Sequence, residues 1–305
     1  MTSRQSYTAL LIAALVAMVA GGCHSHEITD DMSDSTKLEL LDIKLQRHPD
    51  DPKLLAHRAE VLFKLGRAKE ANFDINRAVS LKPDNPDYLM LKADICFANG
   101  DVENSYKALQ EAEQLTPQSI EVQLKMGEIT FYSRDYDRAF ACLTRVTQKD
   151  PNNRTALFMK GFIYKEKGDT ASAVQLFRRV CDKFPDYAPA FEQLGVLYAA
   201  RNENLALEYL NTALQLDPSN TNTMYALAMF YQERKEMDKA ETLYRQILDI
   251  NENSADAWHN LGWIEMTHYS DYTRAVEYFD KALAADPQHE QAQTNRQVAM
   301  QAMGK

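Results

Sequence analysis

The prolines of this chain recur at an even pitch. Pro83, Pro117, Pro151 and Pro185 are each 34 residues apart, Pro49 begins the series one step earlier, and Pro218 and Pro287 continue it. Small residues recur in the same phase and form two further rows: Ala59, Ala93, Gly127, Gly161, Gly195, Ala228 and Gly262; and Ala71, Ser105, Ala139, Ala173, Ala206, Ala240 and Ala275. A period of this length predicts a repeat array, in which each unit buries its apolar face against its neighbours.

One repeat, 154–187, shows what each unit predicts locally. One helical face is formed by Leu157, Gly161 and Tyr164, at spacings of four and three. Gly168 then interrupts the pattern, as a glycine at the C-terminus of a helix would. A second helical face follows and ends at Pro185. Each unit is therefore predicted to be a hairpin of two helices, with small residues where the helices cross.

The repeats resemble the tetratricopeptide repeat family, whose pattern is Trp-x2-Leu-Gly-x2-Tyr, then Ala-x3-Phe, then Pro. Two repeats match it well, through Phe191, Leu194, Gly195, Tyr198, Ala206, Leu210 and Pro218, and through Trp258, Leu261, Gly262, Ala275, Phe279 and Pro287. Seven full repeats share one phase: 52–85, 86–119, 120–153, 154–187, 188–220, 221–254 and 255–289. The resemblance implies an all-α fold, a right-handed superhelical solenoid of helical hairpins.

Two repeats depart from the common length. The fifth is one residue short near Arg201 to Asn204, and the seventh is one residue long near Tyr269 to Asp271. We expect both changes in the turn between the two helices, where a length change costs least. The seventh repeat also carries Glu265 where the family has tyrosine.

Both ends of the array have their own signals. Residues 36–51 read as an orphan second helix, an N-terminal half-repeat that closes at Pro49. Residues 290–305 read as a capping helix with a polar back, which keeps the open end of a solenoid soluble.

The N-terminus resembles a bacterial lipoprotein signal peptide. Residues 1–22 contain Arg4 and then an apolar run from Ala9 to Ala20, too short to span a membrane but right for a secretory signal. The run ends in Ala-Gly-Gly before Cys23, the position that carries the lipid in that family. Residues 23–35 then form an acidic, flexible tether. The alternatives are an uncleaved anchor helix and a secreted protein with an accidental cysteine.

These signals predict a lipid-anchored protein of a bacterial cell envelope. His24 is not aspartate, so the inner-membrane retention signal of enteric bacteria is absent and the outer membrane is favoured over the inner. The formal net charge of −10 disfavours nucleic acid and electrostatic adhesion to anionic lipid. Cys96, Cys142 and Cys181 lie in three different repeats, which favours buried free thiols over disulfides or metal ligands.

No catalytic motif stands in the chain. Nucleophile motifs, phosphate-binding loops, dinucleotide fingerprints and zinc-protease motifs are missing from the sequence, and its 10 glycines are mostly used by the repeat itself. We therefore expect no enzyme, no cofactor and no metal site.

The resemblance places ligand contacts on the first helix of each hairpin, mainly at repeat positions 2, 5, 6, 9, 12 and 13. Position 9 reads Glu60, Asp94, Glu128, Phe162, Val196, Met229 and Trp263, acidic in three repeats and apolar in four. Positions 5 and 12 add Phe158, Tyr225, His259 and Met266 in the later repeats. These residues predict a groove with an acidic N-terminal half and an apolar, methionine-rich C-terminal half. The alternative is that neighbouring helices cover them as core.

The sequence thus predicts a non-catalytic protein-interaction scaffold that binds a peptide segment or helix of an envelope protein in its concave groove. Position 9 lacks the basic and amide residues of chaperone-binding members, so recognition of acidic C-terminal tails is disfavoured. The alternative function is glycan capture, because some envelope lipoproteins with these repeats bind saccharides and aromatic side chains can stack on sugar rings.

Overall fold

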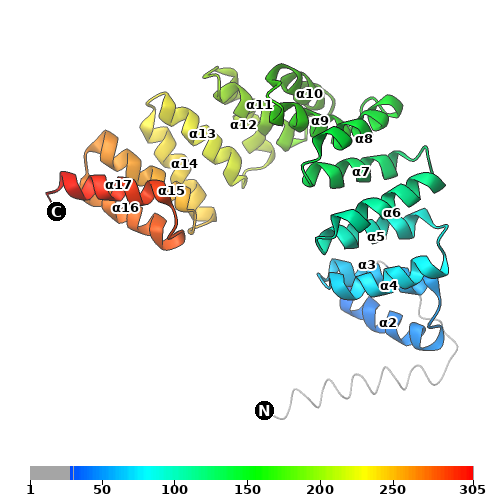
Figure 1. Ribbon diagram of the computed structural model, residues 1–305. Coiled ribbons are helices and arrows are strands. Elements are labelled where there is room, and N and C mark those ends of the chain that lie inside the picture. The colour runs from blue at the N-terminus through cyan, green and yellow to red at the C-terminus, as the bar shows by residue number, and fades with distance from the viewer. Residues whose placement is uncertain (1–27, 30, 305) are drawn as a thin grey trace, which may run out of the picture. The chain divides into compact units, whose positions relative to one another are not determined.

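The computed structural model describes residues 28–29 and 31–304. The signal peptide at 1–22, the lipid-attachment residue Cys23 and residues 24–27 and 30 of the tether at 23–35 lie outside the described residues. The described part of the chain contains sixteen α-helices, one π-helical turn and no strand (Figure 1). The prediction of an all-α fold is confirmed.

The helices follow one another as hairpins. The first helices of the hairpins are α3 (Pro52–Lys64), α5 (Pro86–Ala98), α7 (Ile120–Tyr132), α9 (Arg154–Glu166), α11 (Ala188–Ala199), α13 (Thr221–Glu233) and α15 (Ala255–Ile264). The second helices are α4 (Ala68–Leu81), α6 (Val102–Leu115), α8 (Tyr136–Lys149), α10 (Thr170–Lys183), α12 (Leu205–Leu216), α14 (Met237–Ile250) and α16 (Tyr272–Ala285). A single helix stands at each end, α2 (Asp34–Arg47) and α17 (Glu290–Ala302).

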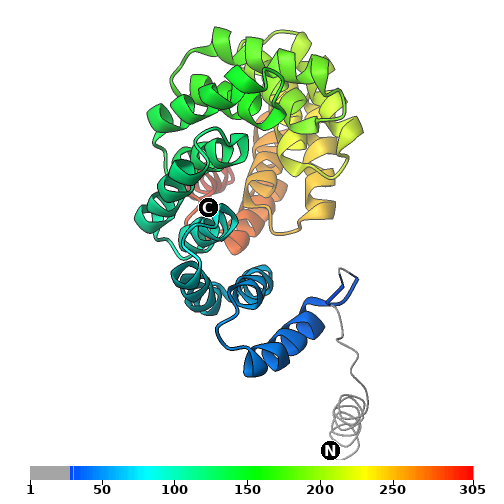
Figure 2. The same ribbon diagram turned by 90° about the vertical axis from the view of Figure 1, so that its right-hand side faces the viewer.

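The chain divides into two compact units. Unit 1 ends at Val122 and unit 2 begins at Gln123, so the division falls inside α7. Within unit 1, α2 packs on α3, and α4 packs on α5. Within unit 2, each hairpin packs on the next from α8 to α17 (Figure 2). Each unit thus builds a core from contacts between neighbouring hairpins, as a repeat array requires.

Local chemistry explains where the helices begin. Asp101, Asp135, Asp169 and Asp271 each precede a second helix and accept a hydrogen bond from a main-chain N–H of its first turn. Asn153 and Asn220 cap first helices in the same way. These caps satisfy donors that have no partner within the helix.

The turn inside each hairpin needs a left-handed residue. Gly66, Gly100 and Gly168 supply it with positive φ, as glycine does at little cost. The other four hairpins use a residue with a side chain at this point: Arg134, Asn202, Lys235 and Ser270. The turn therefore keeps its left-handed backbone geometry even in the hairpins that have no glycine at this point.

The first row of small residues marks helix crossings. A Cβ atom placed on Gly161 would lie 2.7 Å from Cε1 of Phe177, and one placed on Gly262 would lie 2.7 Å from Cε1 of Phe279. Both rings are fully buried on the second helix of the same hairpin. The glycines let an aromatic ring of the second helix touch the backbone of the first.

From the sequence we expected the extra residue of the seventh repeat in the turn between the two helices, but it does not lie there. It is taken up by η1, a π-helical turn from Glu265 to Tyr269 that continues α15. Ser270 then adopts the left-handed conformation with φ 56°. Inserting one residue into a helix widens a turn rather than breaking the ladder of hydrogen bonds, so the next helix can begin in phase.

The missing residue of the fifth repeat shortens the start of α12. That helix has 12 residues where α10 has 14, and the N-cap residue Asn204 before it makes no side-chain cap hydrogen bond. Ala206 and Leu210 are still fully buried. The buried positions of the second helix are therefore kept, and the shortening affects residues at its start that do not contribute to the core.

Candidate functional site

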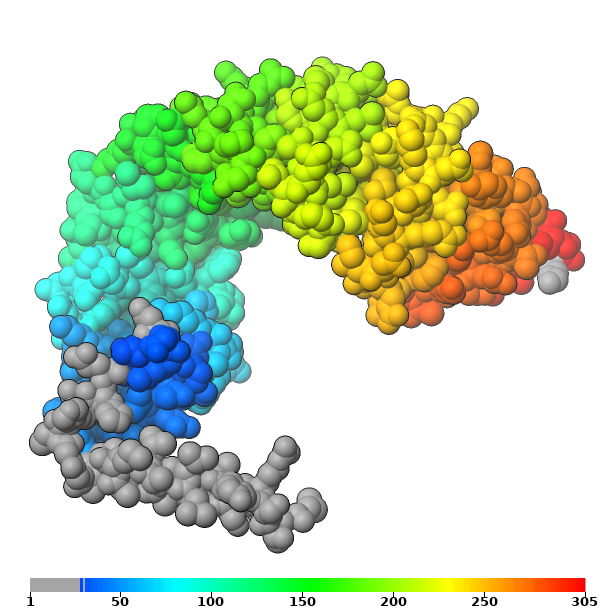
Figure 3. All heavy atoms as spheres, turned by 180° about the vertical axis from the view of Figure 1, so that it is seen from behind, coloured from blue at the N-terminus to red at the C-terminus, as the bar shows by residue number. Residues whose placement is uncertain are grey.

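The hairpins of unit 2 follow one another along a curve, as the atoms coloured green to red in Figure 3 show. The first helix α11 contacts the first helix α13 directly along this stack, and α15 contacts the single end helix α17. The residues predicted for the apolar half of the groove all lie in unit 2, and they fall into three chemically different surroundings.

Phe158 and Phe162 of α9 belong to an aromatic cluster. Their ring centroids are 5.1 Å apart, and Phe162 also lies 5.7 Å from Phe177 and 6.2 Å from Phe131. Phe158 lies 5.2 Å from Tyr187, which follows α10. Both phenylalanines are half-buried, so each combines support from the core with an open face.

Val196, Tyr225 and Met229 continue along α11 and α13, and all three are half-buried. The Tyr244 hydroxyl lies 3.1 Å from the sulfur of Met229, and the Tyr225 hydroxyl accepts a hydrogen bond of 3.1 Å from Nδ2 of Asn260. Met266, in the π-helical turn, is half-buried against the core beneath α16 and α17. These contacts hold the side chains in place without closing them off.

His259 and Trp263 do not continue the apolar surface. They line a polar hollow of about 530 Å³, together with six further residues: Gln232, Asn260, Glu290, Gln291, Thr294 and Asn295. The two residues share one face of α15, and the side chains beside them are polar, whereas the sequence predicted an apolar, methionine-rich groove there. Four of the six polar partners come from α17, whose packing against α15 could not be read from the repeat.

His259 is nearly buried and is held on two sides. Its Nε2 lies 3.0 Å from Nδ2 of Asn295, and its ring centroid lies 5.0 Å from that of His289. Burial, and then the neighbouring His289, lower the pKa of His259 to about 4. His259 is therefore neutral at neutral pH, and its Nε2 can accept the amide proton of Asn295.

The acidic residues predicted for the other half of the groove are not among those that line this hollow. Glu60 and Asp94 lie in unit 1 and Glu128 lies in unit 2, and all three are half-buried. The Glu60 carboxylate forms an ion pair of 2.7 Å with Lys64, one turn along α3. Asp94 and Glu128 also have interaction partners. The acidic half of the groove stays a prediction.

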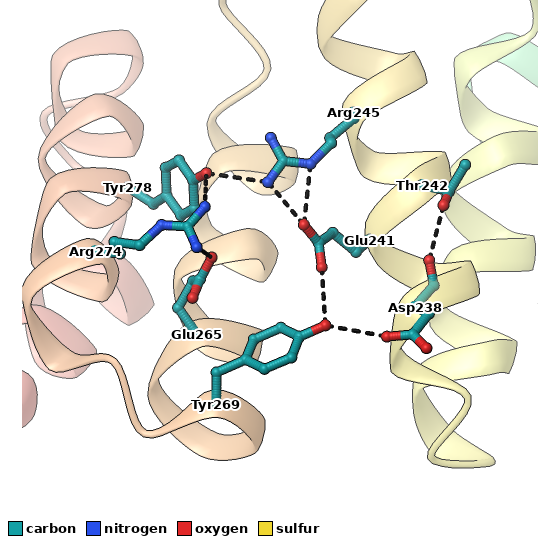
Figure 4. A network of polar contacts seen from close by, with 8 residues as sticks. All are labelled: Asp238, Glu241, Thr242, Arg245, Glu265, Tyr269, Arg274 and Tyr278. Atoms are coloured by element: carbon teal, nitrogen blue, oxygen red, sulfur yellow. Dashed lines mark hydrogen bonds and ion pairs between the residues drawn. The ribbon is translucent and has the colours of Figure 1, made fainter.

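A polar network ties the sixth hairpin to the seventh, and the sequence did not indicate it (Figure 4). The Tyr269 hydroxyl lies 3.0 Å from Oδ1 of Asp238 and 3.2 Å from Oε2 of Glu241, both on α14. On the other side of the network, Arg274 of α16 lies 3.1 Å from Oε1 of Glu265. The π-helical turn brings Glu265 and Tyr269 to this junction, so the extra residue creates the link.

Glu265 is the most unusual group in the network. It is almost fully buried, and its Oε2 has no hydrogen-bond partner among the described residues. Burial raises the pKa of this carboxyl. The one sequence signal for it was the departure from tyrosine at this repeat position.

The remaining predicted features are placed as follows. Cys96, Cys142 and Cys181 are buried, and burial raises the pKa of Cys181 to about 12, which makes it a poor nucleophile. Over the residues that the structure covers, no three histidine, cysteine or carboxylate side chains gather closely enough to hold a metal ion. None of the helices described is long and apolar enough to cross a membrane.

The structure is similar to several solved structures at low sequence identity. A tetratricopeptide repeat protein from Parabacteroides merdae is 16% identical, with a TM-score of 0.63, over 82% of this chain and 98% of that one. Yeast Tom70 is 17% identical with a TM-score of 0.62, over 88% and 58% of the two chains. Cut9, in its complex with Hcn1, is 15% identical with a TM-score of 0.63, over 86% and 52%. The chain thus spans a little over half the length of the Tom70 and Cut9 chains, and these likenesses show the fold alone.

Sequence comparison decides the family. No curated protein matches the chain at a significant level. Two family models, both described as tetratricopeptide repeat, match it: one over residues 58–120, 124–188 and 251–290, the other over 197–262. The first alone covers more than half of the chain, and the two together follow the repeats from the first hairpin to the seventh. The chain belongs to the tetratricopeptide repeat family.

Proposed function

We propose that the chain is a lipid-anchored, non-catalytic scaffold of a bacterial cell envelope, which holds a segment of a partner protein along the first helices of unit 2. Family membership supports the general part, because tetratricopeptide repeats are protein-interaction modules and no enzyme family matches. The anchor and the envelope are supported by the sequence around Cys23.

One observation carries the choice of surface. Phe162, Val196 and Met229 stand at the same repeat position of three successive first helices, and each is half-buried. Apolar surface left open to water marks interaction sites, and methionine and aromatic side chains suit adaptable ones. Because the three side chains come from successive hairpins, a ligand that meets all of them is elongated: an extended segment or a helix.

Site-specific photo-crosslinking tests this surface. A photoreactive amino acid at position 196 on α11 should give a defined crosslinked product in cells, whereas the same group at Glu208, exposed on α12, should not. Adding Phe162→Ala or Met229→Ala should weaken capture, by about 2 kcal/mol or roughly thirtyfold for a binding hot spot. Equal products from both positions, or none from position 196, would contradict the proposal.

The anchor has its own test, which does not depend on the groove. A thioether-linked lipid needs the thiol of Cys23, so Cys23→Ser should leave the protein unprocessed or release it from membranes. Fractionation and mass of the full-length precursor and the mature protein measure this. A variant that fractionates and migrates like the wild type would rule out the lipoprotein assignment while leaving the scaffold function standing.

A further inference from the structure

Two amide side chains of the hollow keep an acceptor oxygen free. Asn260 uses its Nδ2 in hydrogen bonds to the Tyr225 hydroxyl, at 3.1 Å, and to the main-chain oxygen of Asp256, at 2.8 Å. Asn295 uses its Nδ2 on Nε2 of His259, at 3.0 Å. Neither Oδ1 atom accepts a hydrogen bond from the described residues, and neither is among the fully buried polar atoms that lack a partner. They are available to a ligand in the hollow.

Gln232, at the end of α13, offers the complementary group. Its Oε1 accepts a hydrogen bond of 3.1 Å from the Tyr244 hydroxyl, so its Nε2 is left as a donor. Glu290 adds a carboxylate at the start of α17. In each of the three amides, the oxygen or the nitrogen is hydrogen-bonded to the protein, so the other atom already has a fixed direction before a ligand binds. This lowers the entropy cost of binding.

Trp263 adds an aromatic side chain to the lining of the same hollow. The indole is half-buried against the core of the last hairpins, which fixes its plane. Its Nε1 has no acceptor among the described residues, in contrast to Nε1 of Trp258, which donates to the main-chain oxygen of Glu252 at 2.8 Å. An indole is apolar on its face and can donate one hydrogen bond at its edge.

The charge of the hollow disfavours anionic ligands. His259 is neutral and Glu290 is the one charged side chain among the eight that line the space, so nothing there attracts phosphate or carboxylate. The hollow offers acceptor oxygens on Asn260, Asn295 and Glu290 and N–H donors on Gln232, Gln291 and Trp263. Each hydroxyl of a sugar ring can both donate and accept a hydrogen bond, so one ring brings several groups of both kinds to one small volume, whereas an extended main chain brings one donor and one acceptor per residue.

We propose that this hollow is a binding site for a neutral saccharide, with the C–H face of a sugar ring against Trp263 and its hydroxyls on Asn260, Asn295 and Gln232. A volume of about 530 Å³ lies within the range of small-molecule sites, about 300–1,000 Å³, and suits one or two rings. The site goes beyond the proposed grip on a protein segment, because it uses polar atoms that the apolar surface of α9 and α11 does not contain.

The chain's two tryptophans make the test sharp. In a Trp258→Phe variant, Trp263 is the sole tryptophan and reports on the hollow. In a Trp263→Phe variant, Trp258 remains as a matched control, with its ring stacked 5.6 Å from that of Tyr278 on the same hairpin. Tryptophan emission is followed while maltose, cellobiose and N,N′-diacetylchitobiose are titrated separately to millimolar concentration into each variant.

At least one of the three saccharides should change the emission of Trp263 saturably and leave that of Trp258 unchanged. The change should disappear when Asn295→Ala or Gln232→Ala is added to the reporter variant, with both folds checked by circular dichroism. Equal quenching of both tryptophans, a linear response, or no response to any of the three would overturn the proposal.

A peptide excised from a partner crosslinked at position 196 is the second probe. Emission that responds to this peptide and to none of the sugars would make the hollow part of the protein-binding surface and would overturn the saccharide site. The proposed function fails separately, through the crosslinking experiment, whether or not a sugar binds.

Discussion

Substitution of Gly161 tests the packing on which the whole array rests. A Cβ atom at this position would lie 2.7 Å from Cε1 and 3.0 Å from Cδ1 of Phe177, and real Cβ atoms essentially never come closer than about 3 Å to a neighbour. The ring cannot swing away, because Phe177 has no exposed surface. Gly161→Leu should therefore overpack the crossing of α9 and α10.

The expected magnitude follows from two opposing effects. Leucine is roughly 1 kcal/mol better than glycine in an open helix, whereas overpacking a core costs typically about 1–3 kcal/mol for added methylenes and occasionally more. Leucine adds four carbons against a buried ring, so overpacking should win and the melting temperature should fall. One kcal/mol corresponds to about 2–4 °C for domains of about 150–250 residues.

A double-mutant cycle shows whether the ring is the cause. Phe177→Ala alone should cost about 3–5 kcal/mol through the cavity it leaves. In the double variant, leucine at 161 enters that space, so the combined loss should be smaller than the sum by about 0.5–3 kcal/mol. Gln175→Leu, exposed on α10, is the surface control. An unchanged or raised melting temperature for Gly161→Leu, or strictly additive losses, would refute the assigned helix crossing.

Three further substitutions probe the turn, the network and the aromatic cluster. Lys235→Gly should stabilise the protein by about 1 kcal/mol, because Lys235 has φ 61° and glycine adopts that region freely, whereas Lys235→Ala should give no gain. Burial raises the pKa of Glu265, so the contribution of this carboxyl to the stability of the fold is full at low pH and is lost as pH rises through the folded-state pKa. Glu265→Gln should therefore raise the melting temperature at pH 8 more than at pH 4. A larger increase at pH 4 would contradict the direction of the pKa shift. Phe162→Ala should cost less than the about 3–5 kcal/mol of a fully buried phenylalanine, because its ring is half-buried; a full loss in a thermal melt would return it to the core.

Much of the fold could be predicted because each repeat carries its own signals. Gly161 and Gly262 indicated helix crossings, and Gly168 indicated a left-handed turn, because each glycine determines the packing or the backbone conformation within its own hairpin. The π-helical turn at Glu265–Tyr269 was missed, because one extra residue near a turn fits a longer loop as well as a wider helix. Only packing against α14 and α16 favours the helix.

The candidate site was less predictable. Position 9 of the repeat grouped Phe162, Val196 and Met229 as groove residues, and all three are half-buried, because periodicity determines which way a side chain points from its own helix. Their part in binding stays a prediction. Asn295 could not be placed beside His259, since these residues are 36 apart and belong to different helices of the array and the cap. Periodicity contains no information on which polar partners meet across such a distance.

The sequence by itself determined the family, the seven hairpins and the side of each helix that carries apolar residues, because these depend on spacing within 34 residues. The tertiary structure decided which of those residues share a surface. It separated the aromatic cluster around Phe162 from the amide-lined hollow around Trp263, and it linked the last two hairpins through Tyr269. The physical reason is that the packing of α17 on α15, and of η1 beside α14, depends on contacts between hairpins, which the repeat pattern does not encode.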